Sequence, residues 1–146
     1  MPTLSRYFLR GGILYLALGL LPGGIILLQK GTGWLPLAWI LLPAHTYLVL
    51  IGGISQFTLG VCYWIFPRFG GGTSRGNTLL AWLSYATLNA ALGLVIFHLP
   101  IQVLFGAPAA NLAFAGAGIL QSVAALAFVL HIWPRIRAAE PTPRRR

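Results

Sequence analysis

Four apolar stretches, each long enough to cross a membrane, constrain the fold of this chain more than any other feature. They occupy residues 8–28, 44–66, 77–99 and 110–133 of a sequence of 146 residues. A helix needs about 20 apolar residues to cross a hydrocarbon core about 30 Å thick. We therefore predict an all-α polytopic membrane protein, with four transmembrane helices in an up-down-up-down bundle. The last span is expected to close at Pro134, because proline cannot continue helical hydrogen bonding.

Two of these stretches allow a second interpretation. The first could be a secretory signal peptide, but its length and the absence of a small-residue cleavage motif favour a retained helix. The second follows a further apolar segment, residues 34–42, which is interrupted by Pro36 and bounded by Pro43. We interpret this segment as an interfacial one, with Trp34 and Trp39 at the level of the lipid headgroups.

The composition agrees with a membrane protein. Hydrophobic residues make up 58% of the chain and charged residues 8%, whereas soluble domains have about 25% charged residues. Ten Lys or Arg residues stand against a single acid, Glu140. A net charge of +9 suggests nucleic acid as a partner only until the basic residues are assigned to sides of the membrane.

With four spans, nine of the ten basic residues fall on one side and only Lys30 falls on the other. The nine are Arg6, Arg10, Arg68, Arg75, Arg135, Arg137, Arg144, Arg145 and Arg146. The positive-inside rule then places both termini and the middle loop in the cytoplasm. We predict one domain, residues 1–146, in the cell inner (cytoplasmic) membrane, with no nucleic-acid partner. Residues 134–146 form a basic cytoplasmic tail, which acts as a topology signal or contacts anionic lipid headgroups.

The chain lacks the groups that enzymatic chemistry uses. No carboxylate pair or catalytic triad is present, since Glu140 is the only acid and lies in the tail. Cys62 is the only cysteine, so neither an intrachain disulfide nor a cysteine-rich metal site can form. We therefore expect a protein that is not an enzyme.

Helices in lipid associate through small residues that allow their backbones to approach closely. Three such faces are expected, one in each of the last three spans. They consist of Gly52, Gly53 and Gly60; of Ala86, Ala90 and Gly93; and of Gly118, Ser122 and Ala125. The polar residues Gln56, Asn89 and Gln121 should point into the bundle or into a subunit interface, because each needs a hydrogen-bond partner in hydrocarbon.

Two of the three histidines are expected at the same depth. His45 lies 23 residues from Arg68, and His98 lies 23 residues from Arg75, which is about 34 Å along a helix. Both should therefore reach the outer boundary of the hydrocarbon. His131 is only four residues from Arg135, so it cannot join them and is expected to be an interfacial residue.

Two facing imidazoles on neighbouring helices can ligate the iron of a b-type heme. His45 and His98 are therefore the candidate cofactor-binding and metal-binding residues. The aromatic residues Tyr47, Phe97 and Phe105 could form walls around the porphyrin. The alternative is that each histidine is an amphipathic boundary residue with its edge among the headgroups.

The second span carries the most specific motif of the chain: Pro43-Ala44-His45-Thr46, then Gly52-Gly53, then an aromatic segment that ends at Pro67-Arg68. It resembles the second transmembrane helix of the heme-copper oxidase large subunit and of related nitric oxide reductases. In that family a histidine at the outer end of this helix is an axial ligand of the low-spin heme. The resemblance implies this role for His45.

The resemblance covers residues 43–68 only. The family's full subunit has many more helices, and its second heme ligand and copper-binding histidines lie on late helices that this chain does not have. Reduction of oxygen or nitric oxide is therefore not expected of this chain alone. A small four-helix protein that looks like a fragment of that subunit would have to recruit His98 as the second ligand.

These observations lead to two main hypotheses. The first is an integral membrane subunit of a respiratory or other electron-transfer complex, with heme b near the outer face. The alternative is a cofactor-free structural or assembly subunit that packs against a larger membrane complex. Its partners would be membrane lipid and other integral membrane subunits or further copies of itself. A transporter or quinone-binding protein is a third hypothesis, although transporters usually show intramembrane charges or broken helices.

Overall fold

The computed structural model describes residues 1–69 and 74–137, and every regular element in these two ranges is a helix. The elements are α1 (Thr3–Thr32), the 3-10 helix η1 (Pro36–Leu41), α2 (Leu42–Tyr47), the π-helical segment η2 (Leu48–Ser55), α3 (Gln56–Ile65), α4 (Thr78–Ile96), α5 (His98–Phe105) and α6 (Ala107–Arg137). Four helical stretches are long and apolar enough to span a membrane: Thr3–Thr32, Pro36–Ile65, Thr78–Ile96 and Ala107–Ile136. The prediction of an all-α chain with four helices long and apolar enough to span a membrane is confirmed for the described residues.

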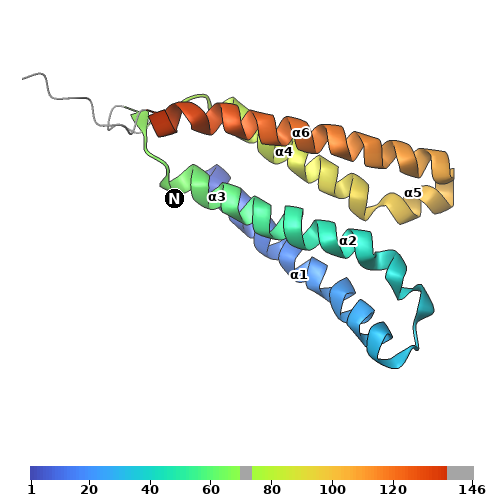
Figure 1. Cartoon of the computed structure of the whole chain (residues 1–146). Coiled ribbons are helices and arrows are strands. Elements are labelled where there is room, and N and C mark those ends of the chain that lie inside the picture. Colours follow the sequence, from blue (N-terminus) through green and yellow to red (C-terminus); the bar gives the residue numbers. More distant parts are fainter. Residues whose placement is uncertain (70–73, 138–146) are drawn as a thin grey trace, which may run out of the picture.

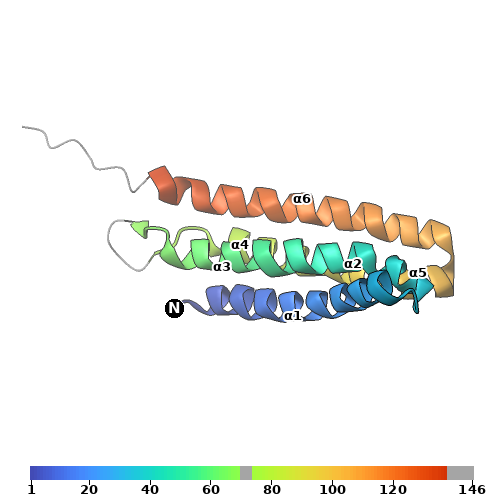
Figure 2. The ribbon, with the colours of Figure 1, turned by 60° about the horizontal axis from the view of Figure 1, so that its bottom comes forward.

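The helices form two hairpins (Figure 1). In the first hairpin α1 packs against η1, α2, η2 and α3, and in the second α4 and α5 pack against α6. The N-terminus, the end of α3, the start of α4 and the end of α6 all lie at one end of the bundle, as both views show (Figures 1 and 2). We call this the basic end, because Arg6, Arg68 and Arg135 lie there. The side of the membrane that it faces stays a prediction.

The opposite end carries α2 and α5, and we call it the histidine end after His45 and His98. In Figure 1 the two hairpins come together at the basic end and diverge toward the histidine end. Within the described part of the chain, α4 also contacts α1, α2 and η2 of the first hairpin. Successive spans run in opposite directions along the bundle, which is the predicted up-down-up-down order (Figure 1).

The structure corrects the third span and the connection that follows it. The helix expected over 77–99 ends at Ile96, and α5 occupies residues that we expected to form a loop. Pro100 lies in the first turn of α5, where a backbone N–H has no partner within the helix and its absence costs nothing. Gly106, with φ of +85°, then allows the sharp turn into α6.

The expected end of the fourth span at Pro134 is wrong. Helix α6 continues through Pro134 to Arg137. A proline ring removes a single backbone donor, and the side chain of Arg135 anchors the last turn on the end of α3, as described below. The rest of the basic tail, residues 138–146 with Glu140, lies outside the described residues.

Glycines bring the helices of the first hairpin into backbone contact. A Cβ atom on Gly60 would lie 2.7 Å from the Cβ of Phe8, and one on Gly12 would lie 2.9 Å from the backbone nitrogen of Phe57. Gly52 and Gly53 face α1 in the same way. The predicted packing face of the second span is therefore confirmed, with α1 as its partner.

The second hairpin packs through different faces from those predicted. Ala86, Ala90, Gly118, Ser122 and Ala125 are exposed, and a Cβ atom on Gly93 or Gly118 would meet nothing within 4 Å. The buried face instead carries alternating small and large residues. These are Ala81, Leu88, Ala91, Leu92, Ala117, Ala124 and Phe128. Small residues occur on both sides of α4 and α6, and the side with interdigitating leucine and phenylalanine buries more surface.

Candidate functional site

His45 lies on α2 and faces α1. Its Nδ1 atom is 2.8 Å from the carbonyl oxygen of Gly19, and the ring occupies the space left by Gly23, where a Cβ atom would approach Cε1 to 2.6 Å. A cavity of about 360 Å³ adjoins it, lined by residues of α1 and α2. If Nδ1 carries the proton for this hydrogen bond, Nε2 keeps a free lone pair.

His98 is the first residue of α5 and is buried, with 6% of its surface exposed. Its Nδ1 atom is 2.7 Å from the carbonyl oxygen of Val95. Its ring centroid lies 4.9 Å from that of Phe114 on α6. The ring therefore packs inside the second hairpin, and the same tautomer as in His45 leaves Nε2 as the free nitrogen.

The structure places both histidines at the same end of the bundle and gives them different neighbours. His45 turns to α1 and His98 to α6, and the cavity beside His45 is lined by α1 and α2 residues rather than by His98. Of the aromatic residues expected around a porphyrin, Phe97 and Phe105 are exposed. The chemistry of the two imidazoles fits heme ligands, and their joint use stays a prediction.

Arg135 forms the most connected polar site that the structure describes, and the sequence analysis did not single it out. Its side chain is fully buried. Nε donates to the carbonyl oxygen of Pro67 at 3.0 Å, and Nη2 donates to the carbonyl oxygens of Tyr63 and Phe66. The last carbonyls of a helix have no partner within the helix, so Arg135 caps α3 from a different hairpin.

His131 lies next to Arg135 on α6 and is buried within the bundle, and its depth at the membrane interface stays a prediction. It has 3% of its surface exposed, and its ring stacks on Tyr63 with the centroids 5.3 Å apart. Its Nδ1 is 2.9 Å from the carbonyl oxygen of Asn77, and its Nε2 is 3.3 Å from Nη1 of Arg135. His131 therefore connects α3, α4 and α6 through one ring.

The charge of this cluster is balanced by dipoles and an aromatic ring. The Cζ atoms of Arg75 and Arg135 lie 5.9 and 5.6 Å from the ring centroid of Tyr63, in the range of cation–π contacts. The C-terminal end of α3 also carries partial negative charge. The burial of Arg135 could have been predicted from helical spacing. Ala124, Phe128, His131 and Arg135 follow one another at intervals of four, three and four residues, which places them on one face of the helix.

Two of the three polar residues predicted to point inward form bonds between the hairpins. The Tyr15 hydroxyl donates to Oδ1 of Asn89 at 2.9 Å, and the Tyr47 hydroxyl donates to Oε1 of Gln121 at 2.7 Å. Gln56 is also fully buried, but neither its amide nitrogen nor its amide oxygen has a protein partner. The predicted direction is confirmed for all three, and the predicted hydrogen bond for two.

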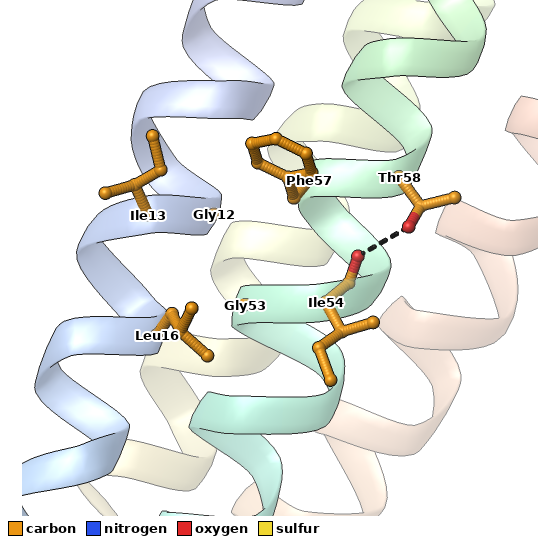
Figure 3. Close-up of a pocket in the computed structure, with 7 residues that line it drawn as sticks. All are labelled: Gly12, Ile13, Leu16, Gly53, Ile54, Phe57 and Thr58. Carbon is orange, nitrogen blue, oxygen red and sulfur yellow. Dashed lines mark hydrogen bonds between the residues drawn. The ribbon is translucent and has the colours of Figure 1, made fainter.

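A cavity of about 240 Å³ lies along the glycine contact between α1 and η2–α3. Figure 3 shows its lining side chains, which are all apolar except Thr58. The Thr58 hydroxyl donates to the carbonyl oxygen of Ile54 at 2.8 Å. This cavity thus offers an apolar surface and no free polar group with which to orient a ligand.

The resemblance of residues 43–68 to the second helix of the heme-copper oxidase large subunit stays a prediction. No protein-family model matches the chain, and no curated protein and no solved structure matches it.

Proposed function

We propose that the chain is an integral membrane subunit that packs against other transmembrane helices in an electron-transfer complex. The outward faces of α4 and α6 support the assembly role. Ala90 and Gly93 on α4, and Gly118 and Ser122 on α6, present small side chains away from the packed core. Transmembrane helices associate through such surfaces, because close backbone approach replaces the hydrophobic drive that lipid does not provide.

Mild extraction of the tagged full chain tests the assembly role. We expect it to migrate on native gels with other membrane subunits at fixed stoichiometry. The double variant Gly93→Leu/Gly118→Leu should release the chain, because added bulk blocks a close helix contact. Gly31→Leu is the matched control, since Gly31 likewise has nothing within 4 Å of its Cβ position and is exposed, but it lies on α1. A chain that is monomeric in mild detergent contradicts the proposal, and so does an assembly of this chain alone.

The electron-transfer role rests on the second candidate feature, a b-type heme held by His45 and His98. Each imidazole uses Nδ1 to bind a backbone carbonyl, which orients the ring and leaves Nε2 for a metal. A bound heme would supply one-electron transfer, while the two histidines would orient it. The cofactor-free alternative assigns the same two rings to hydrogen bonding within their hairpins.

A reduced-minus-oxidised absorbance spectrum of the gently purified protein separates these two versions. Heme binding predicts a b-type α-band that is lost in His45→Ala and in His98→Ala. His131→Ala should keep the band, because His131 lies at the other end of the bundle. A spectrum without the band would contradict heme binding and favour the cofactor-free subunit. A band that survives both His45→Ala and His98→Ala would contradict heme ligation by these residues.

A further inference from the structure

A groove runs between the two hairpins near the middle of the bundle, and we call it the mid-bundle groove. It has a volume of about 270 Å³. The first hairpin contributes Ile51, Ser55 and Leu59. The second contributes, among others, Leu88, Gln121 and Phe128. Its walls are apolar apart from one hydroxyl and one amide, which is the composition of sites that bind small apolar molecules in a fixed orientation.

Each of the two polar side chains of this groove keeps a hydrogen-bond donor that the surrounding helices do not use. Several other hydroxyls in the spans, those of Thr46, Thr58, Thr87 and Ser122, bond the carbonyl oxygen four residues earlier. Among the described residues, no such bond is present for Ser55. Gln121 accepts from Tyr47 through Oε1, and its amide nitrogen donates to no residue that the structure describes. Two residues that line the groove thus each keep a donor that no described residue pairs with.

Ser55 is the last residue of the π-helical segment η2. This segment, Leu48–Ser55, has the wider turn in which backbone bonds run five residues back rather than four. A serine at its end therefore meets different carbonyl positions from a serine in an α-helix. Single π-turns occur frequently at functional sites, and this longer one forms a wall of the mid-bundle groove.

The depth of the two donors restricts what could pair with them. Ser55 lies 12 residues from Pro67, and Gln121 lies 14 residues from Arg135, so both are about 18–21 Å from the basic end. This is well inside a hydrocarbon core about 30 Å thick. Phospholipid ester carbonyls stay near the headgroups, so a partner at this depth must dissolve in the membrane and carry its own acceptor oxygen.

We propose that the mid-bundle groove binds the ring of an isoprenoid quinone. One ring carbonyl accepts hydrogen bonds from the amide nitrogen of Gln121 and the hydroxyl of Ser55. The apolar side chains of Ile51, Leu88 and Phe128 contact the ring, and the isoprenoid tail leaves through the open side of the groove into the lipid. The site extends the proposed electron-transfer role and uses different residues from the heme, so the two proposals can fail separately.

The test is calorimetric titration of the full chain, in nanodiscs of quinone-free phospholipid, with a short-tailed benzoquinone. We expect saturable binding of one quinone per chain. The double variant Ser55→Ala/Gln121→Leu should weaken binding at least tenfold. Leu59→Trp fills the groove and keeps both donors, and it should weaken quinone binding as strongly. This variant replaces the double variant in the test if the double variant does not fold.

Two controls isolate the donors. Tyr47→Phe removes the same hydrogen bond to Oε1 that Gln121→Leu removes, but keeps the amide nitrogen, so binding should stay within about twofold of wild type, a difference of about 0.4 kcal/mol. Ser122→Ala removes a hydroxyl of α6 that is already bonded to Gly118 and should have no effect. Equal affinity of the double variant overturns the proposal. Equal affinity for an alkylbenzene of the same tail length also overturns it, because the groove would then be an acyl-chain site.

Discussion

The two ends of this bundle are fastened in opposite ways. At the basic end, one side chain of the second hairpin, Arg135, bonds three carbonyl groups of the first. At the histidine end, His45 and His98 each bond a carbonyl of their own hairpin. The hairpins come together at the basic end and diverge toward the histidine end (Figure 1). A buried guanidinium group can hold two hairpins together because it donates hydrogen bonds to several backbone carbonyls at once.

The difference follows from the donors available. A guanidinium group has five N–H donors in a fixed plane, and at the end of α3 it meets carbonyls that lack helical partners. An imidazole has one donor in its neutral form, and at the histidine end both Nδ1 atoms lie within hydrogen-bond distance of a carbonyl oxygen of their own hairpin. Toward the histidine end, a neutral hydrogen bond joins the hairpins: the hydroxyl of Tyr47, the last residue of α2, donates to Gln121.

Replacing Arg135 should have the largest effect on this arrangement. In Arg135→Leu, three carbonyls lose a charged donor, and hydrogen bonds to charged groups contribute about 1.5–3 kcal/mol each. We expect the free energy of unfolding in mixed micelles, measured by SDS titration, to fall by about 3 kcal/mol or more. Arg135→Lys should recover part of this loss, because an ammonium group keeps the charge but not the planar set of donors.

Arg6→Leu is the control for charge alone. Arg6 lies at the same end and is exposed, and its guanidinium group donates to the nearby hydroxyl of Thr3. Its removal should leave the free energy of unfolding close to that of wild type. An equal loss in the Arg6 and Arg135 variants would show that net charge, rather than the capping of α3, fastens the basic end.

Changes at the glycine contact should have an intermediate effect, because they act within one hairpin. Gly12→Ala places a methyl group 2.9 Å from the backbone nitrogen of Phe57, and overpacking of this kind costs about 1–3 kcal/mol. Gly24→Ala on the same helix meets nothing within 4 Å, and it should be neutral or stabilising by up to about 1 kcal/mol. The same SDS titration measures both variants, and a similar loss in both would place the effect in the helix backbone instead of in the contact with Phe57.

The smallest effects are expected for the neutral bonds between hairpins. Tyr15→Phe and Tyr47→Phe each remove one interhelical hydrogen bond, and such bonds contribute about 0.6 kcal/mol on average in membrane proteins. Tyr7→Phe provides the baseline for removing a hydroxyl from a tyrosine whose ring, which packs on Trp82 and Tyr85, is kept. If Tyr47→Phe destabilised the protein as much as Arg135→Leu, the histidine end would be fastened as strongly as the basic end, contrary to our comparison.

Much of the fold follows from the sequence, because span length and the distribution of arginines are set by the membrane itself. The four spans, their alternating direction and the packing role of Gly52, Gly53 and Gly60 were predictable. The faces of α4 and α6 were not, since small residues occur on both sides of these helices. Only the packed structure shows that the side with Leu88, Leu92 and Phe128 is buried.

The sites were less predictable than the fold. Depth counting placed His45 and His98 at one end, but it does not specify the neighbours toward which their rings turn. Arg135 counted as a topology signal because arginines near span ends usually extend toward water. Its burial depends on unpaired carbonyls of α3, which lie 68 to 72 residues away in the sequence, and no local pattern shows that these groups meet.

The capping of α3 by Arg135 also has a consequence for how the protein is made. Ribosomes deliver the first hairpin to the membrane before α6, so for part of synthesis the last turn of α3 waits without its guanidinium partner. Helix α6 therefore supplies the hydrogen bonds that the last carbonyls of α3 lack until then. Chains that terminate before residue 135 should insert their first hairpin and yet be recognised by quality-control proteases as unfinished.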